Sequence, residues 1–332
     1  MGEKPPILVS GNLPASVLEY LRKDFQLEYH AEDRPMPRPL LLGSLGDKCG
    51  LLAMITDSVD EELFTHAPQL RMVANMAVGY NNIDVAAATR RGILVSNTPG
   101  VLTDATADLA FSLILATARR VVEGDRIVRQ GEFRFWAPFH FLGRDVSGKT
   151  LGIVGMGRIG QAVARRAAGF GMPVIYYSRK PLKKSLEKAL HATFVPFADL
   201  LKEADFISLH VPLASDTQHL IGKKEFSLMK RTAILINTSR GPVVDEKALL
   251  YALRKGLIAG AGIDVYENEP EITPGLEKIT PAVLLPHVGS ATLETRTMMA
   301  RMAANNLRAG LLGQTPPNLV NPEVMRTKQG LS

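Results

Sequence analysis

The sequence predicts an α/β protein with parallel sheets. Short apolar runs alternate with amphipathic helical segments along most of the 332 residues. Within this alternation, the apolar run at 151–154 is followed by glycines with the spacing G-x-G-x-x-G and then by a helical pattern. A chain of this length can form two ordinary domains, each with its own core.

The glycine-rich turn at 155–160 predicts a dinucleotide site. Gly155 permits the tight reversal from strand to helix, Gly157 lets the backbone approach a pyrophosphate, and Gly160 lets the helix pack on the strand. The pyrophosphate then lies at a helix N-terminus, where free N–H groups favour an anion. A second apolar strand at 173–178 completes the unit, although a tight turn in another kind of α/β protein remains the alternative.

The composition is that of a soluble globular protein. Hydrophobic residues make up 46% of the chain, and no apolar run approaches the about 20 residues that span a bilayer. Charges and a short strand-like run begin the chain, so we expect no signal peptide. The single cysteine, Cys49, excludes an internal disulfide and any multi-cysteine metal site. We expect a cytoplasmic protein without a metal.

The net charge of +6 does not by itself indicate a nucleic-acid partner. Lysine and arginine residues are scattered, and no basic stripe interleaved with aromatic residues is present. Attraction of a small anionic substrate or coenzyme explains the excess of positive charge equally well. Ordinary surface lysines are the remaining explanation.

The first 100 residues predict a small parallel α/β unit. Three prolines at 34–39 indicate a loop, and the turn cluster at 97–100 is a plausible hinge. The predicted strands lie at 7–9, 51–55, 70–76 and 93–95, and the predicted helices at 14–23, 60–66 and 85–91.

A long apolar helix and an aromatic segment follow the hinge. The helix is predicted over about 105–119, capped by Thr103 or Asp104, and the pattern continues helically to 131. The segment 133–142 holds five aromatic residues, which suggests burial against a partner subunit. The alternative is a loop tucked into its own domain.

The rest of the chain repeats strand and helix. Strands are predicted at 151–154, 173–178, 194–195, 206–209, 234–237, 261–265 and 283–285, with helices at 158–169, 183–191 and 197–203. The last helix, 293–312, is too long for the final turn of this sheet, so we expect it to return to the first domain. Pro316 and Pro317 end it.

Polar side chains gather where the strands of the second half end, which is where open parallel sheets bind ligands. Arginine, glutamate and histidine among them suit the reduction of a 2-keto acid. A guanidinium binds a carboxylate, an imidazole donates a proton near neutral pH, and a neighbouring carboxylate favours the charged imidazole. Each residue alone could be structural, but their placement at successive strand ends favours a site. The residues are Ser178, Arg179, Lys180, His210, Thr238, Ser239, Arg240, Asp264, Glu267, Glu269, His287 and Ser290.

The chain resembles the D-isomer-specific 2-hydroxyacid dehydrogenases, most closely their glyoxylate/hydroxypyruvate reductase branch. The resemblance covers essentially the whole chain and rests on seven blocks in the right order. They are MAVGYNNID (76–84), NTPGVLTDATADLAFSLILATARR (97–120), GKTLGIVGMGRIGQAVARRAAGFGM (148–172), ISLHVPL (207–213), INTSRGPVVDEKAL (236–249), AGIDVYENEP (261–270) and LPHVGSAT (285–292).

The resemblance implies a catalytic set of Arg240, Glu269 and His287. It also implies that the backbone N–H groups of Val78 and Gly79 bind the substrate carboxylate, together with Arg240 and His287. The expected coenzyme contacts are Thr106, Gly155, Gly157, Arg158, Ile159, Gly160, Ser178, Arg179, Lys180, His210, Val211, Pro212, Thr217, Thr238, Ser239, Arg240, Asp264, His287, Gly289 and Ser290.

The resemblance further implies two Rossmann-like or flavodoxin-like domains. Residues 1–99 and 290–332 would form a discontinuous substrate domain, and residues 100–289 the dinucleotide-binding domain. Members of the family are usually homodimers built around the helix and arm, here 105–142, and Trp136 is expected to reach the partner's substrate site.

The coenzyme is expected to be NADP(H), with NAD(H) possible. Enzymes that use NAD carry an acid at the end of the second strand, which accepts hydrogen bonds from the ribose. This chain has Ser178, Arg179 and Lys180 there, which offer donors and positive charge to a 2′-phosphate.

The predicted function is the NADPH-dependent reduction of a small anionic 2-keto acid, glyoxylate or hydroxypyruvate. A 2-ketogluconate reductase or another D-2-hydroxyacid dehydrogenase on the same scaffold is the first alternative. A dinucleotide-sensing, corepressor-like binding protein is a distant alternative, because such proteins usually carry long disordered tails that this sequence lacks.

Overall fold

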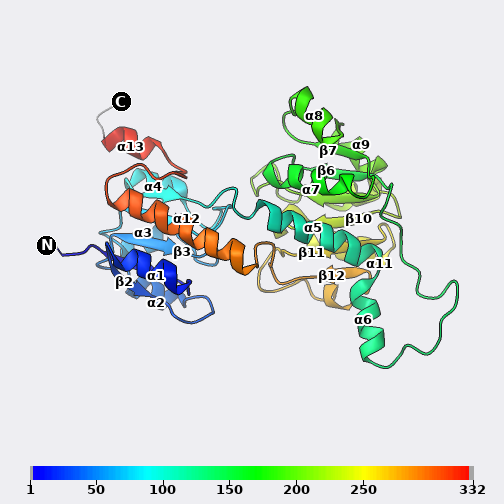
Figure 1. The fold of residues 1–332 in the computed structure, drawn as a ribbon, viewed down its shortest axis with the longest axis horizontal. Coiled ribbons are helices and arrows are strands. Elements are labelled where there is room, and N and C mark those ends of the chain that lie inside the picture. The colour runs from blue at the N-terminus through cyan, green and yellow to red at the C-terminus, as the bar shows by residue number, and fades with distance from the viewer. Residues whose placement is uncertain (1–2, 329–332) are drawn as a thin grey trace. The chain divides into compact units, whose positions relative to one another are not determined.

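The computed structural model describes residues 3–328, and the chain divides into two compact units. Unit 1 combines residues 1–102 with 291–332, and unit 2 comprises 103–290. Each unit is a parallel sheet covered by helices, and Figure 1 shows the helices and strands of each unit coloured by residue number. The predicted α/β class with two parallel sheets is confirmed. Within the described residues, no helix has the length and apolar character needed to cross a membrane.

The sheet of unit 1 has five strands in the order β2-β1-β3-β4-β5, all parallel. Its central strands are buried on both faces, which is why their sequences are continuous apolar runs instead of alternating patterns. The strands are β1 (Pro6–Val9), β2 (Gln26–Tyr29), β3 (Gly50–Ala53), β4 (Met72–Asn75) and β5 (Leu94–Ser96).

Two groups of helices cover this sheet. Apolar side chains of α1 (Ala15–Arg22) and α12 (Leu293–Leu311) form one core with the sheet. Those of α2 (Arg38–Gly43), α3 (Glu61–His66) and α4 (Val85–Arg90) form the other. The last long helix therefore does return to the first part of the chain, as its length predicted. A short helix, α13 (Glu323–Lys328), follows it.

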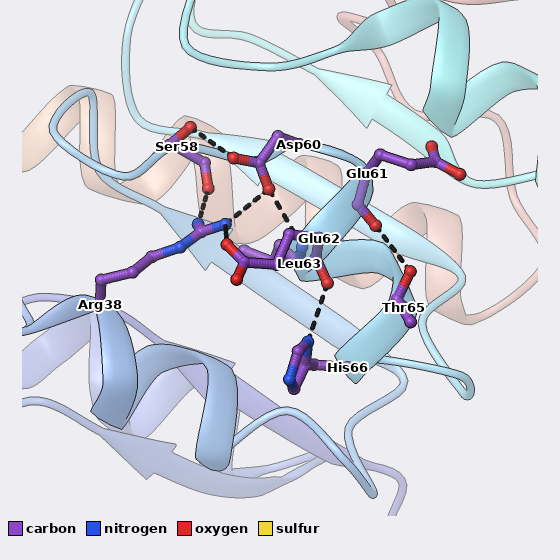
Figure 2. Close-up of polar contacts among 8 residues, drawn as sticks. All are labelled: Arg38, Ser58, Asp60, Glu61, Glu62, Leu63, Thr65 and His66. Atoms are coloured by element: carbon purple, nitrogen blue, oxygen red, sulfur yellow. Dashed lines mark hydrogen bonds and ion pairs between the residues drawn. The ribbon is translucent and has the colours of Figure 1, made fainter.

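The prediction of a loop at 34–39 is correct for 34–37 and wrong at its last two residues, because α2 begins at Arg38. Pro37 precedes the helix and Pro39 lies in its first turn, where no intrahelical N–H donor is needed. The Arg38 guanidinium donates to Asp60 Oδ1 at 2.5 Å and to Glu62 Oε2 at 2.8 Å. Figure 2 shows that it thereby joins α2 to the capped first turn of α3. Strand β2 was not predicted.

The sheet of unit 2 has seven parallel strands in the order β12-β11-β10-β9-β6-β7-β8. The chain order reverses beside β6, since β7 lies on one side of it and β9 on the other, and such a switch point is where doubly wound sheets bind ligands. The strands are β6 (Leu151–Val154), β7 (Val174–Tyr177), β8 (Ala192–Phe194), β9 (Phe206–Leu209), β10 (Ile234–Asn237), β11 (Gly260–Ile263) and β12 (Ala282–Leu284).

Helices cover both faces of this sheet, and two of them were not predicted. One core includes side chains of α5 (Thr103–Ala118) and α7 (Arg158–Ala168), packed near α8 (Lys184–Leu190). The other includes α9 (Phe197–Glu203) and the unpredicted α10 (Lys223–Leu228) and α11 (Glu246–Arg254). Thr103 and Asp104 belong to the first turn of α5, so the expectation that either of them precedes the helix as its cap is wrong.

Helix α6 (Val121–Arg129) and the aromatic segment 133–142 leave the body of unit 2. Figure 1 shows α6 and the loop after it running away from the sheet of their own unit. No residue of α6 is buried, and Trp136 and Phe139 are 80% and 87% exposed. The alternative of a loop tucked into its own domain is therefore wrong.

The loops that follow β10 and β11 meet at Gly241 in direct backbone contact. An ideal Cβ at Gly241 would lie 1.8 Å from the carbonyl oxygen of Tyr266 and 2.5 Å from the nitrogen of Glu267. No side chain fits such a space, because backbone atoms on both sides would have to separate.

We predict that Gly241→Ala lowers the free energy of unfolding by about 3 kcal/mol or more, because the new Cβ forces the two loops apart. Denaturant unfolding followed by circular dichroism measures the change. Gly169→Ala is the matched control in the same unit, since a Cβ there meets its nearest atom at an ordinary 3.5 Å. Equal stabilities for the two variants would contradict the prediction.

Candidate functional site

His287 and Glu269 form a hydrogen-bonded pair at one end of the unit 2 sheet. His287 follows β12, Glu269 lies in the loop after β11, and the distance from Nδ1 to Oε2 is 2.7 Å. The other carboxylate oxygen of Glu269 accepts the N–H of Tyr266 at 3.0 Å. A carboxylate that accepts from Nδ1 fixes a proton on that nitrogen and leaves Nε2 as the atom that a ligand can use.

The charge of Glu269 is stabilised by its neighbours. Burial opposes the charged form, but the hydrogen bond and charge of His287, the N–H of Tyr266 and the charge of Arg240 outweigh it. Together they hold the pKa of Glu269 below its ordinary value. Glu269 is therefore an ionised acceptor at neutral pH.

Arg240 is the third charged member of this cluster. It follows β10, where the Asn237 side chain donates to the Arg240 carbonyl at 2.9 Å and also accepts the N–H of Ser239. Burial lowers the pKa of Arg240, and the charge of Glu269 acts in the opposite direction. A guanidinium keeps its charge in proteins, so this site presents a planar cation suited to a carboxylate.

Asp264, at the end of β11, fixes the backbone of the histidine loop. Its carbonyl accepts the N–H of His287 at 2.9 Å, and its Oδ1 accepts the N–H of Val288 at 2.8 Å. His287 has a φ of 54°, which is uncommon for a residue with a side chain. Such a conformation persists when its surroundings impose it, and functional sites are where it is often found.

The glycine-rich turn lies at the same edge of the sheet. Gly155 has a φ of 97°, and a Cβ there would lie 2.7 Å from the carbonyl of His210 after β9. A Cβ at Gly160 would lie 2.2 Å from the carbonyl oxygen of Gly155. Gly157 instead faces open space and precedes α7, whose first turn has no side-chain cap. The N-terminus of an 11-residue helix is thus left available for an anion.

Three buried polar atoms at successive strand ends make no hydrogen bond to a described residue. They are Nδ1 of His210, Oγ1 of Thr238 and Oδ2 of Asp264, after β9, β10 and β11. Burial lowers the pKa of His210 to about 3, so the imidazole is neutral, and burial raises the pKa of Asp264. Because buried polar groups normally have partners, these atoms indicate that a polar ligand lies along this edge. The donor set and the glycine turn fit a dinucleotide.

The loop after β7 is basic and rigidly held. Arg179 and Lys180 are exposed there, and the Ser178 hydroxyl donates to the Lys180 carbonyl at 2.6 Å. The hydroxyl of the fully buried Tyr176 accepts the N–H of Leu182 at 2.7 Å, which fixes the far end of the loop. Positions 178–180 carry no carboxylate that would repel a phosphate.

The remaining candidate residues fall into three places. The Thr106 hydroxyl donates to the Gly289 carbonyl at 3.2 Å, and the Thr217 hydroxyl donates to the Pro212 carbonyl at 2.7 Å, so both hydroxyls support loops of unit 2. Val78 and Gly79 follow β4 in unit 1, and Trp136 lies in the exposed arm. Arg158 and Ile159 begin α7 directly after the glycine-rich turn. The loops that follow β9, β10 and β12 contain Val211, Ser239 and Ser290, respectively.

Sequence reasoning missed a buried carboxylate that holds the loop of Glu269. Glu246, in the first turn of α11, is 3% exposed and accepts the N–H groups of Glu267 and Thr273 at 2.5 and 3.1 Å. Glu267 in turn accepts the Glu246 N–H and contacts the His219 imidazole. The apolar spacing of 248–253 could have revealed α11, but not that Glu246 points inward.

Comparisons with known proteins agree with this geometry. Residues 111–289 match the family model described as D-isomer specific 2-hydroxyacid dehydrogenase, NAD binding domain. The chain is 53% identical to a glyoxylate reductase of Thermococcus litoralis, over 97% of this chain and 98% of that protein. It is 50% identical to a glyoxylate reductase of Pyrococcus horikoshii over 98% of each.

Solved structures show the same likeness. A glyoxylate/hydroxypyruvate reductase of Sinorhizobium meliloti, described as NADPH-dependent and bound to NADP and malonate, superimposes with a TM-score of 0.84. It is 34% identical, and the match covers 96% of this chain and 97% of that one. With the cluster of Arg240, Glu269 and His287, the glycine-rich turn and the full-length similarity together, the chain belongs to the D-isomer-specific 2-hydroxyacid dehydrogenase family of NAD(P)-dependent oxidoreductases.

Proposed function

We propose that the protein reduces small 2-keto acids, glyoxylate and hydroxypyruvate above all, to the D-2-hydroxy acids, with NADPH as the preferred coenzyme. The observation that carries the proposal is the His287–Glu269 pair beside the Arg240 guanidinium. His287 supplies a proton donor, Glu269 supplies the charge that orients it, and Arg240 supplies a cation that binds the substrate carboxylate. The names of the Thermococcus and Pyrococcus relatives support the choice of substrate.

The three side chains divide the work of the reduction. Arg240 binds the carboxylate of the keto acid, which is also served by the backbone N–H groups of Val78 and Gly79. His287 donates the proton on Nε2 to the keto oxygen as negative charge develops there. Glu269 accepts the hydrogen bond from Nδ1, with 2.7 Å between Nδ1 and Oε2, and stabilises the charged imidazole before the transfer. The bound coenzyme supplies the hydride to the keto carbon.

Unit 2 would hold the coenzyme. The turn at Gly157 and the N-terminus of α7 suit its pyrophosphate, and the unpartnered atoms of His210, Thr238 and Asp264 suit its polar groups. Asp264 is assigned to the nicotinamide end, because it also fixes the loop of His287. Residues 1–99 and 290–332 are correspondingly assigned to substrate binding, and 100–289 to the coenzyme.

We predict that His287→Ala lowers kcat for glyoxylate by about 10³-fold, since the keto oxygen loses its proton donor. NADPH oxidation measures kcat, and quenching of coenzyme fluorescence measures its Kd, which should remain within twofold. His66→Ala, an exposed histidine at the end of α3, is the control and should leave both unchanged. Near-normal turnover by His287→Ala would refute the role.

A panel of 2-keto acids in the same assay, with 2-ketogluconate included, separates the substrates. Glyoxylate or hydroxypyruvate should give the highest kcat/KM. A higher value for 2-ketogluconate would favour the alternative of another D-2-hydroxyacid dehydrogenase on this scaffold.

The proposed preference for NADPH rests on the loop after β7. Arg179 and Lys180 place two exposed cations where an acid would bind the ribose of NAD, and the loop is held by Tyr176 and Ser178. A 2′-phosphate adds about two negative charges, so cations at this point favour NADPH over NADH.

We predict that the double variant Arg179→Ala, Lys180→Ala raises KM for NADPH at least tenfold and changes KM for NADH by less than threefold. Steady-state kinetics with both coenzymes measures the two values. Lys188→Ala, an exposed lysine of α8, is the control for a general loss of positive charge. A wild-type kcat/KM that is higher with NADH than with NADPH would refute the preference.

We also propose a homodimer formed through α6 and the arm at 133–142. Phe133, Phe135, Trp136 and Phe139 are all more than half exposed, as is Val128 of α6. Several large apolar side chains exposed together on one helix and the segment that follows it are typical of an interaction site. Trp136 is assigned to the partner's substrate site.

Sedimentation should give a mass twice the 36.1 kDa of one chain. Val128→Asp with Phe139→Asp should give a monomer, because the charges would be buried at the interface. Trp136→Ala should instead keep the dimer and raise KM for glyoxylate. Dimers of unchanged affinity in the double aspartate variant would contradict this interface.

A cytoplasmic location completes the proposal. The chain has a single cysteine, the buried Cys49, so its fold needs no disulfide from an oxidising compartment.

A further inference from the structure

The loop after β4 has three consecutive carbonyl groups held by hydrogen bonds. The Ala77 carbonyl accepts the N–H of Thr98 at 2.9 Å. The Val78 carbonyl accepts the Asn97 side-chain amide at 2.7 Å, and the Gly79 carbonyl accepts the Asn75 side-chain amide at 2.9 Å. Two asparagine side chains and one backbone group thus fix the orientation of three peptide planes.

The orientation of these planes decides where the next N–H groups point. In a trans peptide, the N–H points opposite to the carbonyl of the preceding residue. The N–H groups of Val78, Gly79 and Tyr80 therefore point away from the groups that bind the carbonyls. No described residue of unit 1 accepts a hydrogen bond from them. Successive backbone N–H groups of this kind form an anion-binding concavity.

Asn97 is held by two other asparagines. Its carbonyl accepts the side-chain amide of Asn306 at 3.0 Å, and its N–H donates to the Asn318 carbonyl at 3.3 Å. Asn306 is fully buried in α12, and its side-chain oxygen accepts the N–H of Asn318 at 3.2 Å. Two residues near the C-terminal end of the sequence, Asn306 and Asn318, thus fix the backbone from which the Asn97 side-chain amide projects.

Asn75 is held in a similar way from its own side of the loop. It is fully buried at the end of β4, and it exchanges side-chain hydrogen bonds with Asn82 at 3.2 and 3.3 Å. The Asn82 amide also donates to the carbonyls of Met54 and Asp57. The donor that reaches Gly79 is therefore anchored to the end of the neighbouring strand β3.

We propose that Asn75 and Asn97 are positioning residues for the substrate carboxylate, and that Tyr80 supplies a third backbone donor beside Val78 and Gly79. This inference rests on the proposed reduction of 2-keto acids. The amides suit the task because they donate to the loop carbonyls without adding a charge. An aspartate at either position would be unable to donate and would repel the incoming anion.

The test measures substrate and coenzyme separately in the full-length protein. Asn97→Ala and Asn75→Ser should each raise KM for glyoxylate about tenfold, because charge-assisted hydrogen bonds lose their alignment. They should change kcat by less than threefold and leave KM for NADPH unchanged. The Kd of oxalate, an inert dicarboxylate measured by calorimetry, should rise by the same factor.

Asn321→Ala is the matched control. Asn321 is also fully buried in unit 1, where its side chain donates to the Ile93 carbonyl and accepts the N–H of Val95. This variant should lower Tm at least as much as Asn97→Ala does, with unchanged KM and oxalate affinity. An equal rise of KM in the control, or a parallel rise of KM for NADPH, would overturn the inference.

The oxalate measurement separates this inference from the proposed function. A wild-type protein that reduces no 2-keto acid yet binds oxalate, with binding weakened by Asn97→Ala, would refute the function and support the anion site. A wild-type protein that reduces glyoxylate, with KM and oxalate Kd unaffected by both asparagine variants, would refute the positioning role alone.

Discussion

The backbone contact at Gly241 is the constraint on which the candidate site depends. It brings the loop after β10, which carries Arg240, against the loop after β11, which carries Glu269. The buried Glu246 strengthens this arrangement, because its carboxylate binds two N–H groups of the second loop while Glu267 binds its N–H in return. Close backbone packing and hydrogen bonds therefore set the spacing between the two loops that carry Arg240 and Glu269.

The site could be predicted in outline because its signals are local in sequence. An apolar strand, a polar residue at its end and a glycine-rich turn can each be recognised within about ten residues, and parallel topology brings strand ends to one edge. His210, Thr238 and Asp264 were expected at that edge on these grounds, and the structure places them after β9, β10 and β11. What local patterns could not show is that each of these residues keeps one polar atom that has no partner among residues 3–328.

The parts that escaped prediction depend on tertiary contacts. Prolines at 37 and 39 indicate a loop, but helix α2 tolerates them because both lie at its start and Arg38 joins it to α3. An acidic residue in the first turn of a helix is usually exposed, but Glu246 is buried because the loop after β11 packs over it and donates two N–H groups to its carboxylate. The asparagines of unit 1 are similar, since Asn97 and Asn306 are more than 200 residues apart in sequence.

The two units differ in the kind of group that they offer to an anion. Unit 2 offers the guanidinium of Arg240, whose charge also stabilises ionised Glu269. Unit 1 offers backbone N–H groups oriented by neutral amides. A lysine or arginine on the loop at 78–80 would attract an anion from every direction, because the field of a full charge extends well beyond the group that it contacts. Neutral N–H donors instead favour an anion only where they point, because a dipole fixed in one direction acts at short range on the group it faces.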